Sequence, residues 1–456
     1  MSTYTSVTDA DLERMLATIG VGTVEDLFAE IPAALRLGRP LALDDGLSEQ
    51  EVYAELRALA ARNASTEDEI CFLGAGMYDS YVPALVDAII MRSEFLTPYT
   101  PYQPEISQGG LQAMFEYQTA ISELTGLPIS NASVYELSSA VAGAGYVAKH
   151  AGSGRRFVVS RGVHPHAIET LRTVAHGYGM DVELAPLVDG RTELPALDDD
   201  VSAVIVSQPN FLGAVERLDS LSEQAHEAGA LAICTCDPIS LGLLKSPGEQ
   251  GVDIAVGEGQ TLGNRLDYGG PSFGFFAVTE ALVRRLPGRI AGATRDVDGR
   301  RGFVLTLQTR EQHIRREKAT SNICTAQALN ALAGIIYLSW LGRRGIVELA
   351  ELLAQRTAYA RERLTALPGV EALHEQPVVR EFAVRLGAPV ERVIARCRER
   401  GIHPGYALER TDPELAGGLL VAITEQRTRA QIDALADVLG EAVAAERAAS
   451  AAGVAS

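Results

Sequence analysis

The sequence predicts an α/β protein with a large domain built on a mostly parallel sheet and a smaller α/β domain toward the C-terminus. Two patterns support this prediction. Short β-branched runs alternate with helical segments from about residue 70, and these runs are apolar along nearly their whole length. Strands that are apolar on both faces are typical of a parallel sheet covered by helices on both sides. Such a sheet binds ligands beyond the carboxyl ends of its strands.

The order of the elements predicts four parts of the chain. Residues 1–69 are expected to form an N-terminal helical arm, and residues 70–324 the large α/β domain. Residues 325–444 are expected to form a long linking helix and the small C-terminal α/β domain. Residues 445–456 lack apolar periodicity and are expected to form a flexible tail. Strands are expected at residues 157–160, 182–187, 203–207, 230–236, 254–256, 273–278, 381–386 and 418–424, and helices at residues 51–62, 165–176, 220–228, 325–367, 390–400 and 429–444.

Composition narrows the classes of function. The chain of 456 residues has 40 basic and 59 acidic side chains, which give a net charge of -19 at pH 7. Because this charge would repel phosphate backbones and anionic lipid surfaces, neither nucleic acid nor a membrane is an expected partner. A signal peptide and a membrane span are not expected either, since no suitable apolar run is present. The five cysteines form no C-x-x-C pair, so we expect no metal site and a reducing, cytoplasmic setting.

Asp237 is a candidate for contact with a cofactor. It follows the apolar run 231–236 and precedes Pro238. A carboxylate at the end of such a strand points into the ligand crevice, and in enzymes that use pyridoxal phosphate (PLP) it pairs with the pyridinium nitrogen. The alternative is that Asp237 caps the turn after its strand, because Asp before Pro is common in turns. Taken alone, the residue favours the turn cap.

The lysine that a PLP enzyme needs is missing from its expected place after the next strand. Gln260 occupies that place, and a primary amide cannot form an imine with the aldehyde of the cofactor. The chain contains three lysines, Lys149, Lys245 and Lys318. They are expected near a helix C-terminus, in a loop and in a charged run, respectively, so each has a structural explanation. The sequence therefore predicts that this chain does not bind PLP covalently.

Two further segments are candidates for binding. Residues 131–140 could open a helix onto an anion, but Glu136 would repel it, so a capped helix with an acidic first turn is the favoured interpretation. Residues 97–109 contain three prolines that fix an extended backbone, from which two tyrosines and several polar side chains project. Such a loop either reaches a ligand or partner, or is a rigid connector with tyrosines packed beneath it. Composition does not choose between these two interpretations.

The same segments resemble a known family. The string YTPYQPEISQG at residues 99–109 is similar to the N-terminal subunit of the split glycine dehydrogenase (decarboxylating), the P-protein of the glycine cleavage system. The resemblance runs from the arm to about residue 440. Residues 134–140 depart from the family pattern at Glu136 and Leu137. Further similar strings follow in the same order at residues 115–118, 208–213, 237–242, 269–274 and 300–303, with Gln312.

The resemblance implies the fold of PLP-dependent transferases of fold type I. It also implies a heterotetramer of two such chains and two homologous, lysine-bearing chains, the second subunit of the enzyme. In this family PLP is bound by a lysine of that partner, and the present type of chain completes the active site at the interface. The complex decarboxylates glycine and passes the aminomethyl group to the lipoyl group of the H-protein. The chain is therefore expected to be an enzyme subunit that is inactive alone.

The resemblance also suggests which residues this chain contributes. Tyr99 and Tyr102 are expected to line the substrate pocket of the partner. Asp237 and Gln260 are expected to mark the positions of the pyridinium aspartate and the lysine in a degenerate site. Tyr117 is expected on the helix after the loop, with a peripheral hydroxyl group. The residues expected to support the loop or to bond across the interface are Gln103, Glu105, Ser107 and Gln108.

Two other functions stay open from the sequence. A self-sufficient PLP aminotransferase or lyase would need one of the three lysines at its cofactor. A scaffold or regulatory subunit would bind a partner and leave its turnover unchanged.

Overall fold

The computed structural model describes residues 6–319 and 321–454. The chain divides into two compact units, one ending at Ala64 and the other beginning at Ser65. In the first unit, Thr8 and Ser48 are the N-cap residues of α1 and α2, and each forms a capping box. No residue from 6 to 64 is buried, so the described part of this unit has no core of its own. Its elements are α1 (Asp9–Ile19), η1 (Val24–Phe28), η2 (Ala33–Leu35) and α2 (Glu49–Ala60).

The second unit is built on a seven-stranded sheet in the order β2-β10-β9-β8-β7-β3-β4. Neighbouring strands from β4 to β9 are parallel, and β10 runs antiparallel to both of its neighbours. The predicted mostly parallel sheet is therefore confirmed. Its strands are β2 (Ile129–Ser130), β3 (Arg156–Ser160), β4 (Asp181–Ala185), β7 (Val201–Gln208), β8 (Leu231–Cys236), β9 (Ile254–Glu258) and β10 (Gly274–Val278).

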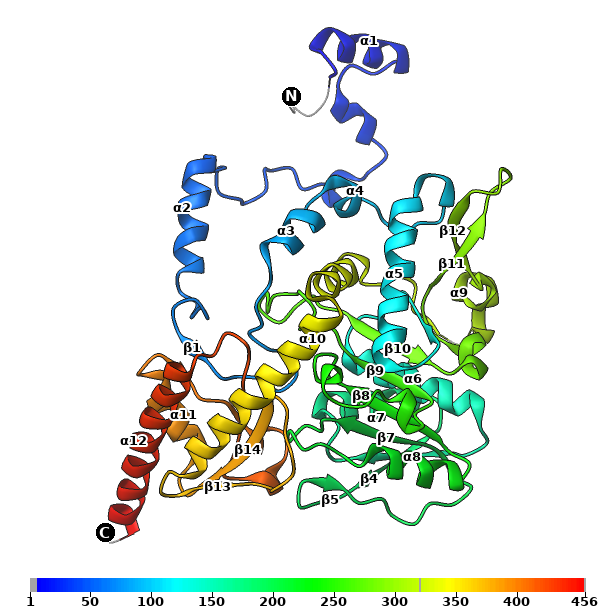
Figure 1. The fold of residues 1–456 in the computed structure, drawn as a ribbon. Helices are drawn as coiled ribbons and strands as arrows, with labels where there is room; N and C mark the ends of the chain where they lie inside the picture. The colour runs from blue at the N-terminus through cyan, green and yellow to red at the C-terminus, as the bar shows by residue number, and fades with distance from the viewer. Residues whose placement is uncertain (1–5, 320, 455–456) are drawn as a thin grey trace. The chain divides into compact units, whose positions relative to one another are not determined.

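Helices cover both faces of this sheet (Figure 1). Within β8, Ala232 and Cys234 belong to one apolar core and Ile233 to the other, which explains why the strands are apolar along most of their length. The first core also receives side chains of α5, α8 and α10, and the second receives side chains of α6 and α7. The helices of this layer are α3 (Ala84–Ile90), α4 (Ser93–Leu96), α5 (Gln108–Thr125), α6 (Leu137–Ala151), α7 (Pro165–Gly177) and α8 (Leu218–Glu227).

The long helix α10 (Ala328–Thr365) leads from the large sheet to a second sheet, and Gly342 interrupts it with a φ of 63°. This second sheet is antiparallel and has four strands in the order β13-β14-β17-β16. A further short strand, β1, pairs in parallel with β15. These elements are β1 (Ile70–Cys71), β13 (Val370–Ala372), β14 (Glu381–Leu386), α11 (Val390–Arg398), β15 (Ile402–His403), β16 (Tyr406–Ala407), β17 (Gly418–Ala422) and α12 (Arg429–Val454).

Three parts of the chain differ from the sequence prediction. The expected tail is helical as far as α12 extends, to Val454, because its many alanines have the highest helix propensity. Residues 455 and 456 of that tail lie outside the described residues. The segment before α10 forms the hairpin β11 (Ile290–Arg295) and β12 (Arg301–Thr306), followed by α9 (Gln312–Arg315). The strand expected at residues 182–187 ends at Ala185, and the short antiparallel pair β5 (Leu187–Val188) and β6 (Arg191–Thr192) follows it.

No helix of the described residues is long and apolar enough to cross a membrane.

Candidate active site

Asp237 lies directly after β8, where the parallel sheet would place a ligand-binding carboxylate. Its Oδ1 accepts a hydrogen bond from the backbone N–H of Ile239 at 3.2 Å, so Asp237 does cap its turn. The same oxygen also lies 3.2 Å from Nη1 of Arg380, which is 3% exposed and stacks 3.8 Å from the ring centre of Tyr78. The carboxylate that would pair with a pyridinium nitrogen therefore forms an ion pair with Arg380 of the same chain.

Gln260 is completely buried, and its amide is fully engaged. Its Oε1 accepts from the backbone N–H of Tyr78 at 3.0 Å, while its Nε2 donates to the carbonyls of Tyr78 at 3.0 Å and Asn264 at 2.8 Å. These bonds tie the segment around Tyr78 to the end of the sheet. The side chain at the position where the sequence predicts a missing lysine thus holds the segment around Tyr78 in place.

The start of α6 is closed to an anion by two carboxylates. Glu136 accepts from the N–H groups of Ser138 at 2.5 Å and Ser139 at 2.9 Å, and Glu258 accepts from the N–H of Leu137 at 3.1 Å. A phosphate bound at a helix N-terminus would need these same N–H groups. The capped helix favoured by the sequence is therefore confirmed, with Glu136 itself as the N-cap.

Burial raises the pKa of Glu258 to about 7, although hydrogen bonds from Ser272, Leu137 and Gln260 favour its charged form. Burial likewise lowers the pKa of His164, whose Nε2 lies 2.8 Å from the carbonyl oxygen of Ala75. Both shifts have the same physical origin, since a charged group is disfavoured in a dry pocket. The walls of this pocket therefore carry less charge near neutral pH than their residue types suggest.

The cavity left between these groups has a volume of about 80 Å³. Ligand pockets usually measure roughly 300–1,000 Å³, so this one has room for only a few water molecules. It is lined by Asp237, Glu258 and His164 among others, and no lysine is among its lining residues. Because Asp237 is paired with Arg380, the start of α6 is capped and no lysine lines the cavity, the pocket does not fit PLP.

The three lysines lie elsewhere in the fold. Lys149, near the end of α6, donates to the carbonyl of Tyr178 at 2.7 Å and stacks over its ring. Lys245 is exposed between the short turns η4 (Ser240–Gly242) and η5 (Gly248–Gln250), and Lys318 is exposed at the end of η8 (Arg316–Lys318). Their expected structural roles agree with these positions.

The tyrosine loop connects α4 to α5 and presents its rings outward. Tyr99 is 79% exposed and Tyr102 is 49% exposed, so neither is packed beneath the loop. The hydroxyl of Tyr102 accepts a hydrogen bond from Nη2 of Arg289 at 3.0 Å. The geometry therefore disfavours a simple connector and leaves both tyrosines available to a partner.

Gln108 fastens the end of the loop to the hairpin β11–β12. Its Oε1 accepts from the N–H of Phe303 at 2.8 Å, and its Nε2 donates to the carbonyls of Phe303 at 2.9 Å and Pro104 at 2.6 Å. Ser107 lies at the N-cap position of α5 without a capping bond from its side chain. Glu105 lies within η3 (Pro104–Ile106), and it and Gln103 are exposed. Of the four expected supporting residues, Gln108 is the one that the structure connects to another element.

Tyr117 is on α5, as expected, but its hydroxyl is not peripheral. The side chain is 1% exposed, its ring centre lies 5.7 Å from that of Phe273, and its hydroxyl has no partner among the described residues. A cavity of about 310 Å³ lies between this residue and the loop, with Tyr99, Met114 and Leu332 in its walls. The sequence position alone could not distinguish an inward from an outward face of the helix.

Sequence reasoning missed Arg289, Arg380 and Glu258. The two arginines are each 3% exposed, and each directly precedes a strand. Arg380 carried a usable signal because the strand after it, β14, is mostly buried, and a buried charge needs a partner and is rare without one. Arg289 carried no such signal, since β11 is exposed over half of its length. Glu258 carried a similar signal, since it ends the apolar strand β9.

Comparison with known proteins identifies the family. The family model described as "Glycine cleavage system P-protein" matches residues 2–439. The chain belongs to this P-protein family. It is 49% identical to the "Probable glycine dehydrogenase (decarboxylating) subunit 1" of Moorella thermoacetica, over 95% of this chain and 98% of the relative. The protein of the same name from Geobacillus kaustophilus is 47% identical over 96% and 98% of the two chains.

Solved structures agree with this P-protein assignment. A crystal structure of glycine decarboxylase (P-protein) of the glycine cleavage system, in inhibitor-bound form, is similar with a TM-score of 0.90 and 44% identity, over 97% of this chain and 100% of that chain. A sphingosine-1-phosphate lyase of Burkholderia pseudomallei has a TM-score of 0.61 at 17% identity, which shows a common fold only. The predicted fold of PLP-dependent transferases of fold type I is confirmed.

Proposed function

We propose that this P-protein chain is one of two subunits of glycine dehydrogenase (decarboxylating) and that it completes the active site of a homologous, lysine-bearing partner. The observation that supports this most strongly is the closed cofactor pocket, in which Gln260 replaces the lysine and three hydrogen bonds hold its amide. A self-sufficient PLP enzyme has no support in this geometry. The relatives named "subunit 1" support the existence of a second subunit.

In this proposal the partner holds PLP, which supplies an electron sink for the decarboxylation of glycine. The aminomethyl group then passes to the lipoyl group of the H-protein. Two chains of each kind form the complex. This chain contributes by binding the partner, by excluding water from the shared site and by presenting the tyrosine loop to the substrate.

Large apolar side chains are exposed on three segments of the second unit, namely the turn between α3 and α4, the tyrosine loop and α10. Met91, between α3 and α4, is 65% exposed, and Ile106 within the loop is 82% exposed. Trp340 is 50% exposed on α10, the helix that packs against α3. Large exposed apolar side chains of this kind mark protein interaction sites, and permanent complexes bury more than roughly 2,000 Å². We therefore place the partner against this side of the second unit.

Replacement of single tyrosines tests the catalytic part of the proposal. Tyr99→Phe or Tyr102→Phe removes one hydroxyl group and keeps the ring, so the complex should still assemble. Loss of a positioning hydrogen bond costs about 1–3 kcal/mol, and we expect at least one of these variants to lose roughly 5- to 150-fold in kcat. Tyr117→Phe is the matched control, because its hydroxyl has no partner among the described residues, and its kcat should change less than about threefold.

The assay is kcat of the reconstituted complex, with assembly checked by sedimentation. Near-wild-type rates for all three variants would show that the chain is a scaffold.

A further inference from the structure

Arg289 is buried directly beneath the exposed ring of Tyr102. The arginine immediately precedes β11 and is 3% exposed. Its Nη2 donates to the hydroxyl of Tyr102 at 3.0 Å, and its guanidinium carbon lies 4.8 Å from the ring centre. The same nitrogen donates to the carbonyl of Cys324. The phenol is therefore held in two ways, by a hydrogen bond and by a cation–π contact.

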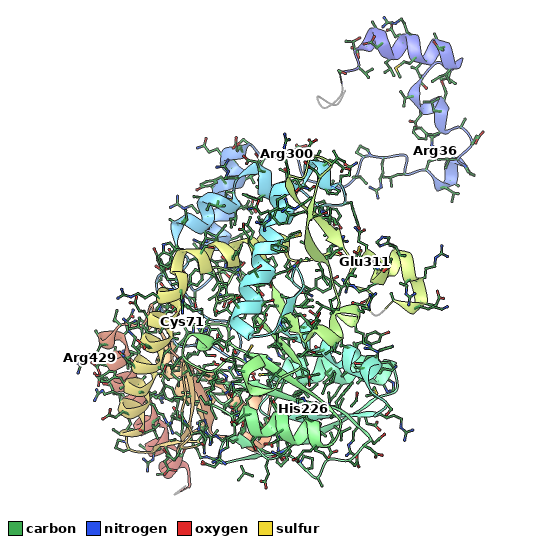
Figure 2. All side chains as sticks on the ribbon, turned by 45° about the vertical axis from the view of Figure 1, so that its right-hand side comes forward. Arg36, Cys71, His226, Arg300, Glu311 and Arg429 are labelled. Carbon is green, nitrogen blue, oxygen red and sulfur yellow. The ribbon has the colours of Figure 1, made fainter. Side chains whose placement is uncertain are left out.

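The guanidinium of Arg289 is only partly paired. Its Nε and Nη1 are buried and have no acceptor among the described residues, as is also true of two nitrogens of Arg380. The nearest carboxylate, that of Glu311 before α9 (labelled in Figure 2), lies 3.8 Å from Nη2, which is beyond hydrogen-bond distance. The side-chain hydrogen bond of Arg289 is therefore the one to Tyr102.

Arg310 provides a comparison within the same part of the fold. Its three guanidinium nitrogens donate to the backbone carbonyls of Leu307, Leu286 and Gly288. This arrangement is that of an arginine whose role is structural, because every nitrogen has a backbone acceptor. Arg289 differs in that its contact to a side chain is directed at the loop.

The hydrogen bond also determines what Tyr102 can still do. Because the hydroxyl oxygen accepts from Arg289, its own O–H remains free to donate in another direction. The positive donor polarises this O–H and strengthens such a bond. Tyr99 has no side-chain hydrogen bond among the described residues and is more exposed, so its hydroxyl is not held before a partner binds. Of the two tyrosines, Tyr102 is the preorganised one.

We propose that Arg289 is a positioning residue for Tyr102, and that Tyr102, not Tyr99, donates a hydrogen bond to the substrate in the partner's site. The proposal rests on the proposed function, in which the loop reaches that site. It adds which of the two tyrosines contacts the substrate, and it adds Arg289 as a residue that acts through Tyr102.

The first test concerns the geometry and needs no activity. In the full chain, 3-fluorotyrosine is incorporated at Tyr102 and its ¹⁹F resonance is recorded. Arg289→Met keeps the volume of the side chain and removes its charge, so it should shift this resonance. Arg295→Met, which removes an exposed arginine at the far end of the same strand β11, is the control and should leave it in place. An unchanged resonance in the Arg289→Met chain would overturn the proposed contact.

The second test is a double-mutant cycle in the reconstituted complex. Tyr102→Phe and Arg289→Met should each lower kcat by roughly 5- to 150-fold, with the KM for glycine within about threefold of wild type. The kcat of the double variant should be no lower than that of the less active single variant, because both changes remove the same interaction. Arg289→Lys should recover part of the rate, since an ammonium can donate to the hydroxyl without stacking on the ring.

The outcomes separate this proposal from the function on which it rests. A lowered kcat for Tyr102→Phe with a normal kcat for Arg289→Met would overturn only the positioning role. A lowered kcat for Tyr99→Phe alone would overturn the choice of tyrosine and leave the loop catalytic. Effects of Tyr102→Phe and Arg289→Met that multiply in the double variant would also overturn the coupling.

Discussion

Restoring a lysine at position 260 should not restore cofactor binding to this chain. The Gln260→Lys variant has the amine that the fold uses, but three other obstacles stay in place. Glu136 and Glu258 still accept the N–H groups at the start of α6, Arg380 still pairs with Asp237, and the cavity still measures about 80 Å³. A phosphate would have to displace two carboxylates from the helix N-terminus before it could bind.

The Gln260→Lys substitution should also lower the free energy of unfolding of the second unit, because it removes hydrogen bonds of the buried amide. Lysine cannot accept from the N–H of Tyr78, and it cannot reproduce both bonds that Nε2 donates at 3.0 and 2.8 Å. Loss of these bonds at a completely buried position, with one donor left unpaired, should cost about 2–4 kcal/mol. For a cooperative unit of roughly 400 residues, this corresponds to a decrease in Tm of roughly 2–5 °C.

The assay is titration of the isolated variant with PLP, followed by the absorbance of the lysine-bound cofactor, together with scanning calorimetry. Gln260→Met serves as the control, because it removes the same hydrogen bonds without introducing an amine. Stoichiometric binding of PLP at micromolar concentration by Gln260→Lys alone would refute the closed-pocket reasoning. If the reasoning holds, binding should require that Glu136 and Glu258 are also replaced by glutamine.

Three further predictions follow from individual contacts. The pKa of Glu258 is about 7 in the folded chain against an ordinary value of 4.5, so the unfolded chain ionises first as pH rises. The free energy of unfolding should therefore fall by up to about 3 kcal/mol between pH 4.5 and 7. Glu258→Gln should abolish this part of the dependence of Tm on pH. Gln108→Ala removes three hydrogen bonds and should accelerate amide exchange in β12, whereas Gln112→Ala, on the next turn of α5, should not. Borohydride reduction of the assembled enzyme should place the pyridoxyl label on the partner chain, and a label on Lys149, Lys245 or Lys318 would contradict the proposed division of labour.

The sheet and its helices could be predicted because the spacing of apolar residues and the local composition define each strand and helix separately. Strand β8 and helix α7 were expected within one residue of their observed bounds, since apolar runs and helical spacing define them directly. The hairpin β11–β12 was not expected, because only alternate residues such as Phe303 are buried against α5, and the signal is weak over six residues. The helical continuation of α12 was missed for the opposite reason, since alanine favours a helix without an apolar stripe.

The site was predictable as far as single residues determine chemistry. Gln260 excludes an imine wherever its side chain points, so that inference needed no structure. The contacts of Arg289 and Arg380 join residues separated by 187 and 143 positions, and no local pattern reports such pairs. The inward hydroxyl of Tyr117 likewise depends on which face of α5 meets Phe273, a property of packing between elements.

A titration determines whether this chain is required for catalysis although it holds no cofactor. A fixed amount of the purified lysine-bearing partner is mixed with increasing amounts of this chain, and glycine-dependent exchange of CO₂ is measured. We expect no exchange for either chain alone and a rate that rises to a plateau at one chain per partner, with one PLP per pair. Full activity of the partner alone, or activity of this chain in its absence, would contradict this expectation.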